Sequence, residues 1–496
     1  MTSDVIHAPE LAGAVEWLNV PHPLTLKKDL RGKIVLLDFW TYGCINCMHV
    51  LPDLKRLEHK YREELVVVGI HSAKFTNERK SDNIRRIITR YEIEHPVAND
   101  ADFKIWRAYG VRAWPTLVLI DPAGYVVATA SGEGKFDAFD QAIAAVRMVF
   151  DERGELDRRP IPLVLEGIGQ TDRLLRFPGK LTIDSASDRL FVADSNHNRI
   201  LVVSPTGVLQ EQIGSGQVGS VDGSFDNAQF YRPQGLCYDA SRDTLFVADI
   251  ENHLVRAAHL GARTVSTVAG TGKQAAWIGD GGAARQTALN SPWDLALLER
   301  EAGPLLLVAM AGSHQIWMID LERSLAFRYA GSGREARVDG AVDDAAFAQP
   351  SGLALDGRSL FVADAESNII RKIDLPPSNE VTTLAGGDLF DCGDTDGRGD
   401  AVRLQHPLGI ATLDGLLYIA DTYNHKIKVL DPRTRKVTTV AGSGAMGSAD
   451  GPLKSATFHE PGGIAAAAGK LYVADTNNHA IRRIDLDVGQ VGTVVL

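Results

Sequence analysis

The 496-residue sequence has few cysteines, no long apolar run and no excess of basic residues. Two of its four cysteines, Cys237 and Cys392, stand alone, which excludes a disulfide framework of the kind that holds small secreted proteins together. The first residues lack a basic start followed by an apolar core, and no stretch approaches the roughly 18 apolar residues of a membrane helix. We therefore expect a cytoplasmic protein with no export signal and no membrane segment.

Basic residues are in the minority, with 52 Lys and Arg against 63 Asp and Glu and a net charge of −11. The first 150 residues carry 19 basic and 19 acidic side chains, so the whole negative charge lies in the rest of the chain. Nucleic-acid binding depends on basic clusters that neutralise phosphates. We therefore expect no nucleic-acid partner. The length exceeds the roughly 100 to 150 residues of one ordinary domain, so at least two domains are expected.

One pattern recurs six times in the second part of the chain. Each copy starts with P-x-G-L or a variant of it and continues to a strand such as LFVAD, and most copies end with a form of T-x-V-A-G-x-G. Copies follow one another at intervals of 54 to 61 residues, and one acidic position, replaced by Met in the third copy, marks each: Asp194, Asp249, Met310, Asp364, Asp421 and Asp475. Each copy predicts one antiparallel blade, and six blades bury their apolar faces by forming a ring.

The repeated unit resembles the NHL repeat over residues 175–496, and this resemblance implies a six-bladed β-propeller. The repeated Asp can cap the turn after its strand. Alternatively, the acidic side chains form a ring that binds a cation or a basic ligand at the propeller mouth. Histidines that can brace the same turn, or else contribute to a metal site, recur at one later position: His253, His314, His425 and His479. We expect no metal, because equivalent positions of different blades lie far apart, and we expect a protein partner on a propeller face.

The first 150 residues alternate strands and helices instead. Apolar runs at 33–40, 64–72 and 115–121 predict buried strands, and amphipathic patterns at 45–63 and 77–93 predict helices. A short helix at 103–110, a strand at 125–133 and a helix at 135–154 complete a β-α-β-α order with a β-β-α end, which is typical of a thioredoxin-like fold. We divide the chain into a thioredoxin-like domain at 1–150, a linker at 151–174 that could supply a ring-closing strand, and the propeller at 175–496.

Two short stretches make the resemblance to thioredoxins specific. The run VLLDFWTYGCINC (35–47) resembles the family's active-site strand and the C-x-x-C that follows it on a helix. The run AWPTLVLID (113–121) resembles the loop with the family's cis-proline, here Pro115, and Pro52 stands where the active-site helix has its proline. The chain thus resembles the thioredoxin-like NHL-repeat-containing proteins. We expect a multidomain fold class, an α/β thioredoxin-like fold followed by an all-β six-bladed β-propeller.

The cysteine pair predicts thiol–disulfide exchange. Cys44 stands at the start of the expected helix, where unpaired amides and the helix dipole favour a thiolate, so it is the candidate nucleophile. Cys47 lies one turn further along the same helix face and is the candidate resolving thiol. Asp38 lies in the apolar strand beneath, where a carboxyl needs a partner or a raised pKa. The resemblance implies that Asp38 moves a proton to and from Cys47.

Three residues near the cysteines are expected to contact a substrate protein: Trp40, Trp114 and Pro115. Core packing is the alternative for Trp40. His49 and His71 are left out of the site, because a lone histidine is more often a satisfied core or surface residue. One C-x-x-C supplies two ligands where structural zinc needs four, so we expect no metal and no cofactor other than the redox-active disulfide of the cysteine pair.

These observations favour a thiol-disulfide oxidoreductase whose propeller selects or docks a protein substrate that carries a thiol or disulfide. One alternative is a non-enzymatic interaction scaffold in which the thioredoxin fold is a structural module. Another is a propeller lyase or hydrolase that holds a metal in its channel. Ile45 and Asn46 stand in place of the Gly-Pro of ordinary thioredoxins, so the sequence leaves open whether the pair reduces, oxidises or isomerises its substrate.

Overall fold

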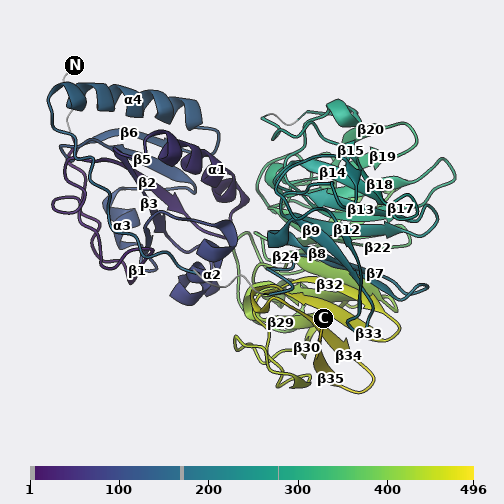
Figure 1. Ribbon diagram of the computed structural model, residues 1–496. Helices are drawn as coiled ribbons and strands as arrows, with labels where there is room; N and C mark the ends of the chain where they lie inside the picture. Colours follow the sequence, from purple (N-terminus) through teal and green to yellow (C-terminus); the bar gives the residue numbers. More distant parts are fainter. Residues whose placement is uncertain (1–5, 168–172, 277–278) are drawn as a thin grey trace. The chain divides into compact units, whose positions relative to one another are not determined.

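The computed structural model describes residues 6–167, 173–276 and 279–496, and the chain forms two compact units, residues 1–171 and 172–496 (Figure 1). Each unit has its own sheets and its own apolar core. Among the described residues, no helix is long and apolar enough to cross a membrane.

The first unit is built on a six-stranded mixed sheet with the order β1-β4-β3-β2-β5-β6. Strand β3 is parallel to β2 and β4, whereas β1, β5 and β6 are antiparallel to their neighbours. Strands β2 and β3 are central because their runs are almost entirely apolar and buried. The strands are β1 (Glu16–Leu18), β2 (Ile34–Trp40), β3 (Leu65–His71), β4 (Val97–Asn99), β5 (Thr116–Ile120) and β6 (Val126–Ser131).

Helices cover both faces of this sheet. Apolar side chains of α1 and α4 pack on one face, and α3 packs on the other with the segment around Leu11 and Leu24. The single helix expected at 77–93 is interrupted, because Lys80 has an extended backbone (ψ 122°) between the 3₁₀ turn η1 (Asn77–Arg79) and α2. The thioredoxin-like fold class is confirmed. The helices are α1 (Ile45–Lys60), α2 (Ser81–Tyr91), α3 (Lys104–Ala108) and α4 (Phe136–Glu152).

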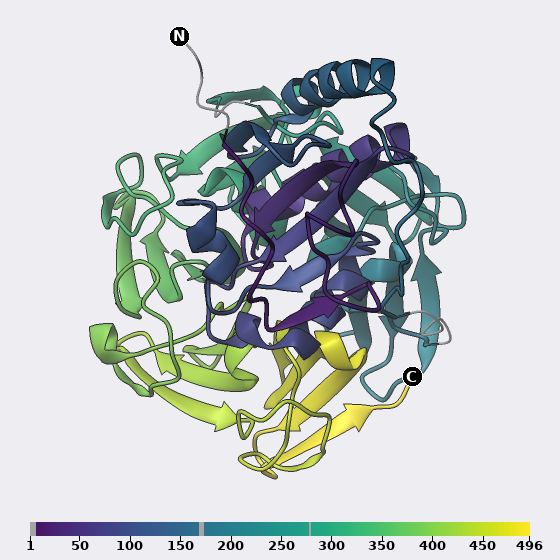
Figure 2. The same cartoon turned by 90° about the vertical axis from the view of Figure 1, so that its left-hand side faces the viewer.

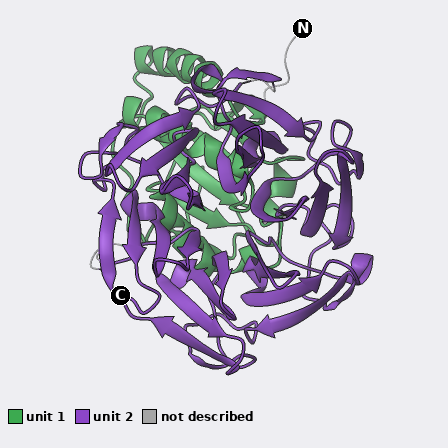
Figure 3. Cartoon of the chain, turned by 90° about the vertical axis from the view of Figure 1, so that its right-hand side faces the viewer, with its two compact units in different colours: residues 1–171 green, residues 172–496 purple. Residues whose placement is uncertain are grey.

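The second unit is a ring of six blades that follow one another in chain order (Figures 2 and 3). Each blade has four antiparallel strands, and blades 2 to 6 carry a short fifth strand on the outer edge. The innermost strands contact one another around the ring, and β32 of blade 6 contacts β7 of blade 1. The six-bladed β-propeller is confirmed. Within 153–167 and 173–180 the structure has no strand, and residues 168–172 lie outside the described residues.

The strand bounds show how regularly the repeat is used. Blade 1 consists of β7 (Leu181–Asp184), β8 (Arg189–Asp194), β9 (Arg199–Val203) and β10 (Leu209–Ile213). Blade 2 consists of β11 (Gly223–Ser224), β12 (Pro233–Asp239), β13 (Thr244–Asp249), β14 (Leu254–His259) and β15 (Thr264–Ala269). Blade 3 consists of β16 (Gly281–Ala283), β17 (Pro292–Leu298), β18 (Leu305–Met310), β19 (Gln315–Asp320) and β20 (Leu325–Ala330).

The remaining blades keep this order. Blade 4 consists of β21 (Gly340–Ala341), β22 (Pro350–Asp356), β23 (Ser359–Asp364), β24 (Ile369–Asp374) and β25 (Glu380–Ala385). Blade 5 consists of β26 (Gly397–Arg398), β27 (Gly409–Leu413), β28 (Leu416–Asp421), β29 (Lys426–Asp431) and β30 (Lys436–Ala441). Blade 6 consists of β31 (Gly451–Pro452), β32 (Pro461–Ala467), β33 (Lys470–Asp475), β34 (Ala480–Asp485) and β35 (Gln490–Val494).

The apolar core of the propeller lies between its blades. Each of six buried clusters joins side chains of two neighbouring blades, and one of them joins blade 6 to blade 1. A blade therefore buries both faces only when it has a neighbour on each side, which is why the ring closes.

Candidate active site and the repeated positions of the propeller

Strand β2 delivers the cysteine pair to the start of α1. The N-cap residue of α1 is Cys44, whose extended backbone (φ −95°, ψ 115°) turns the chain into the helix. Its carbonyl accepts the N–H groups of Cys47 at 3.1 Å and Met48 at 3.2 Å, so Cys44 sits at the positive end of the helix dipole. Both cysteines are free thiols and both are buried, Cys44 with 4% and Cys47 with 0% of its surface exposed.

The acid expected beneath the pair is in place. Burial raises the pKa of the Cys47 thiol well above its usual value, and the neighbouring Cys44 thiol and Asp38 carboxylate raise it further. Asp38 is fully buried in β2, and burial raises its pKa to about 7 although His95 acts in the opposite direction. No described residue forms a hydrogen bond with either Asp38 carboxylate oxygen. A buried acid that titrates near neutral pH can accept and return a proton.

The three residues expected to contact substrate differ in their exposure. The Trp114–Pro115 peptide is cis. Pro115 is buried and lies beside the end of β2, because its neighbour Thr116 pairs with Phe39. Trp114 is half-buried, and its Nε1 donates to the Ser72 carbonyl at 2.9 Å. Trp40 is fully buried. A side chain with no exposed surface cannot form part of a substrate-binding surface, so the structure shows the packing alternative for Trp40.

The two histidines left out of the site differ in their surroundings: His49 faces a carboxylate, whereas no described residue forms a hydrogen bond with either ring nitrogen of His71. His71 is fully buried, stacks on Tyr42 and meets the edge of Trp40, and burial lowers its pKa to about 3. His49 points to Glu133, with 2.5 Å between Nδ1 and Oε2. Neither contact involves the cysteines.

Glu78 was not foreseen, and it holds the loop between β2 and Cys44. One of its buried carboxylate oxygens accepts the Gly43 N–H at 2.9 Å, and the other accepts the Thr41 hydroxyl at 2.5 Å and the N–H groups of Lys74 and Phe75. Burial raises its pKa, and the hydrogen bonds act in the opposite direction. No local sequence pattern signals this role, because Glu78 is one charged residue at the start of an expected helix.

In the propeller, the repeated Asp ties distant parts of one blade together. Each carboxylate accepts a main-chain N–H from 16 to 18 residues upstream at 2.7 or 2.8 Å, and in blades 2, 5 and 6 it also accepts the amide of the Asn three residues on. We expected this carboxylate to accept the amides of its own turn. That expectation is wrong about the donor, because the main-chain N–H comes from the segment before the innermost strand. The carboxylates concerned are Asp194, Asp249, Asp364, Asp421 and Asp475.

Four of these carboxylates pair with a buried cation seven residues further on. The distances range from 2.9 to 3.4 Å, and the cations are Arg256, Arg371, Lys428 and Arg482. Blade 3 replaces both members together, with Met310 at the acidic position and Trp317 at the basic one. Replacing a buried ion pair as a unit avoids an unpaired buried charge. Among the described residues no cluster of His, Cys, Asp or Glu could hold a metal ion.

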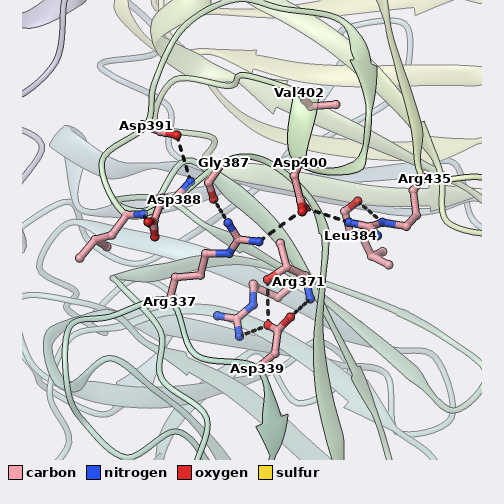
Figure 4. Close-up of polar contacts among 12 residues, drawn as sticks. Arg337, Asp339, Arg371, Leu384, Gly387, Asp388, Asp391, Asp400, Val402 and Arg435 are labelled. Carbon is pink, nitrogen blue, oxygen red and sulfur yellow. Dashed lines mark hydrogen bonds and ion pairs between the residues drawn. The ribbon is translucent and has the colours of Figure 1, made fainter.

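Further ion pairs lie within blades 4 and 5 and between them (Figure 4). Arg371 donates to Asp339 at 2.8 Å, and Asp400 accepts from Arg337 and Arg435 at 3.5 and 3.0 Å. These charges serve contacts within the propeller.

The repeated His position joins each blade to the next. The acceptor is the ring Nδ1 of the His, or the amide oxygen of the Asn that replaces it in blades 1 and 4. The donor is the main-chain N–H of the residue before the P-x-G-L proline of the next blade, and the six bonds are 2.8 to 3.1 Å long. Every acceptor residue has a left-handed backbone, with φ between 51° and 59°. The expected bracing role is thus extended from the turn to the blade junction. The six acceptors are Asn198, His253, His314, Asn368, His425 and His479.

Two departures from P-x-G-L close the centre of the ring. Four blades have Gly at the third position of this motif, but blade 1 has Lys180 and blade 3 has Asp294. The Lys180 ammonium donates to Asp294 at 2.7 Å and to the main-chain carbonyls of Ser351 and Leu408 in blades 4 and 5. A side chain from blade 1 that meets blades 3, 4 and 5 crosses the propeller axis, and its three N–H donors are all used. In the sequence, Lys180 and Asp294 are visible as the two copies of the motif that lack Gly at this position.

Comparison with known proteins gives matches to both units. A family model described as Thioredoxin-like matches residues 32–126, and one described as NHL repeat matches residues 230–257, 404–430 and 458–484. The chain is 42% identical over 522 residues to NHL repeat-containing protein 2 of Homo sapiens, covering 99% of this chain and 71% of that protein. It is 46% identical over 499 residues to Protein SUPPRESSOR OF QUENCHING 1, chloroplastic, of Arabidopsis thaliana, covering 97% of this chain.

The coverage of these relatives is unequal. The chain spans 47% of the length of the Arabidopsis protein, so that relative contains much that this chain does not match. A shorter match, 30% identical over 108 residues, links 21% of this chain to 57% of the Thiol-disulfide oxidoreductase ResA of Halalkalibacterium halodurans.

Proposed function

Because the chain belongs to the family of thioredoxin-like, NHL-repeat-containing proteins that includes NHL repeat-containing protein 2, we propose that it is a thiol-disulfide oxidoreductase acting on proteins. The observation that carries this proposal is the placement of Cys44 and Cys47 at the start of α1, with the unpaired carboxyl of Asp38 buried beneath Cys47. The match to a relative named as a thiol-disulfide oxidoreductase supports the same reaction class.

The residues can carry out disulfide reduction in two steps. The Cys44 thiolate attacks one sulfur of a substrate disulfide, the substrate S–S bond breaks, and the released sulfur takes up a proton. Cys47 then gives its proton to Asp38, and its thiolate attacks the Cys44 sulfur; the second substrate sulfur leaves as a thiolate and takes up a proton. Two electrons pass to the substrate, and a Cys44–Cys47 disulfide remains. The reverse sequence oxidises a substrate dithiol, and no further cofactor is needed.

The propeller is proposed to dock the protein partner. Its repeated Asp, Arg and His residues are used in contacts within and between blades, and Lys180 closes its centre, so a partner would contact the loops of a face. Trp114 and Pro115 are proposed to contact the substrate near the cysteines. We also propose a reducing compartment, the cytoplasm, because four cysteines in 496 residues, with Cys237 and Cys392 far apart in the sequence, do not form a disulfide framework. The Arabidopsis relative is named as chloroplastic.

Mild oxidation followed by peptide mapping tests the redox proposal. Purified protein should form a reversible Cys44–Cys47 disulfide, and Cys47→Ser should accumulate mixed disulfides with partner proteins. Cys237→Ser is a matched control, because burial raises the pKa of that thiol to about 12 and it should stay inert. If Cys44 and Cys47 stay free and a small disulfide substrate is not turned over, the oxidoreductase function is wrong and the scaffold alternative is favoured.

A further inference from the structure

Three buried polar groups lie close to Gly69: the Asp38 carboxyl, the Trp40 indole N–H and the His95 ring. On the parallel ladder Asp38 pairs with Gly69 and Trp40 pairs with His71, so these residues share the sheet face that α1 covers. A Cβ atom at Gly69 would lie 2.9 Å from Trp40 Nε1 and 3.4 Å from His95 Nε2. The absence of a side chain at Gly69 therefore lets the His95 ring reach the neighbourhood of the Asp38 carboxyl.

His95 is held in this position by main-chain contacts. Asn19 donates its side-chain amide to the His95 carbonyl at 2.8 Å, and the Gly69 N–H donates to the Pro96 carbonyl at 2.9 Å. The other ring nitrogen, Nδ1, lies 3.3 Å from a carboxylate oxygen of Glu58. The His95 side chain is 4% exposed and that of Glu58 is 29% exposed, so the contact leads from the interior to the surface.

The polar atoms of Asp38, Trp40 and His95 that lie near Gly69 have no hydrogen-bond partner among the described residues. These atoms are the Asp38 carboxylate oxygens, Trp40 Nε1 and His95 Nε2. Buried polar groups without partners are costly and uncommon, so several in one place need an explanation. Burial lowers the pKa of His95, but Glu58, Asp38 and the adjacent Glu94 raise it above its usual value. His95 in turn lowers the raised pKa of Asp38.

We propose that Cys47, Asp38, His95 and Glu58 form a proton path between the buried resolving thiol and solvent. This inference rests on the proposed oxidoreductase function and names how its second step is supplied. As Cys47 attacks the mixed disulfide, its proton passes to the Asp38 carboxylate and then to Nε2 of the neutral form of His95, which carries its proton on Nδ1. The Nδ1 proton of His95 moves to Glu58 and from there to water. His95 and Glu58 act through Asp38, and neither touches the reacting sulfur atoms.

The pH profile of mixed-disulfide resolution tests this path. A mixed disulfide between Cys44 and a small thiol is formed, and its resolution is followed in a single turnover from pH 5 to 9. His95→Asn should slow resolution about tenfold near neutral pH, which is less than the roughly 10²- to 10⁴-fold effect of a directly acting acid or base, because His95 acts through Asp38. It should also move the midpoint of the profile to higher pH, because Asp38 loses the neighbour that lowers its pKa. Glu58→Gln should change both in the same direction by less.

Matched controls and a second measurement separate the possible results. His59→Asn and Glu63→Gln alter exposed residues at the same end of α1 and should leave the profile unchanged. A carbon NMR titration of the Asp38 carboxyl reports its pKa without turnover, and that pKa should rise in His95→Asn. If wild-type protein does not resolve the mixed disulfide, the proposed function fails. If wild-type protein resolves it but both variants keep the wild-type pH profile and the wild-type Asp38 titration, the proposed proton path is wrong. If His95→Asn does not fold, the pH profile and the Asp38 titration of Glu58→Gln alone test the path.

Discussion

Lys180 and Asp294 form an ion pair at 2.7 Å across the propeller axis, although 114 positions separate them in the sequence. Burial lowers the pKa of Lys180 and raises that of Asp294, and each partner opposes the effect on the other. The pair and the two carbonyls bound by Lys180 connect blades 1, 3, 4 and 5 directly.

Removing one member of this pair should destabilise the propeller. Lys180→Met leaves the Asp294 charge buried and unpaired, and we expect a loss of about 3 to 5 kcal/mol in the free energy of unfolding, measured with denaturant. Lys180→Met with Asp294→Asn should recover most of the loss, because no charge is then left unpaired. Exposed Lys436→Met should change little. A single-variant loss below about 1 kcal/mol would contradict a structural role.

The junction between blades 6 and 1 should depend on a hydrogen-bond acceptor at position 479. His479→Ala removes the acceptor for the Phe177 N–H and leaves alanine, which has no polar side chain, in a left-handed backbone conformation. We expect the free energy of unfolding to fall by about 2 kcal/mol. His479→Asn should retain most of the stability, because Asn makes the same contact in blades 1 and 4. Thermal unfolding of both variants provides the comparison. Equal losses would show that the contact itself contributes little.

Glu78→Gln should disturb the loop that precedes Cys44. A glutamine offers one acceptor oxygen and one N–H₂ group, so either the Gly43 N–H or the N–H groups of Lys74 and Phe75 lose their acceptor. We expect about 2 kcal/mol of destabilisation and a slower reaction of Cys44 with a small disulfide. Stopped-flow kinetics and denaturant unfolding measure the two effects. Exposed Glu63→Gln serves as the control, and unchanged Cys44 kinetics would remove Glu78 from the site.

Asp38→Asn should make stability less dependent on pH. The pKa of Asp38 is about 7 in the folded protein against an ordinary value of 3.8, so the folded state binds more protons and stability falls as pH rises through this interval. At one pKa unit per 1.36 kcal/mol, the cost above pH 7 is about 4 kcal/mol, and it vanishes below pH 3.8. The variant should therefore be more stable at pH 8 but not at pH 4, and slower in resolving mixed disulfides. Asp82→Asn, on exposed α2 surface, is the control.

The sequence was most informative where the fold repeats itself. Six copies of one pattern predicted six blades, and the strand-and-helix order of the first unit predicted a thioredoxin-like fold, because apolar periodicity reflects burial directly. The placement of Cys44 and Cys47 on α1 followed from local order in the same way. The variant residues Lys180 and Asp294 were visible as departures from the pattern, but their meeting depends on ring closure.

Other parts of the site depend on the folded structure alone. Glu78 contacts Gly43 across 35 positions, and His95 approaches Glu58 across 37, so neither contact has a local sequence signal. Trp40 could be assigned to the core or to a substrate surface on equal terms until its burial was known. Lys80, which interrupts the helix expected at 77–93, ends one helical pattern without a Gly or Pro to mark the break.

The hydrogen bonds between neighbouring blades recur at one position in every blade, so the six junctions are equivalent in this contact. The bond from the Phe177 amide to His479, which joins the last blade to the first, is made at the same repeat position as the five bonds between blades that the chain already connects, and all six are 2.8 to 3.1 Å long. At these contacts, the joint that closes the ring is built like the other five. The order in which the polypeptide visits the blades could be shifted by one or more places, as in a circular permutant, and every joint would keep its present bond.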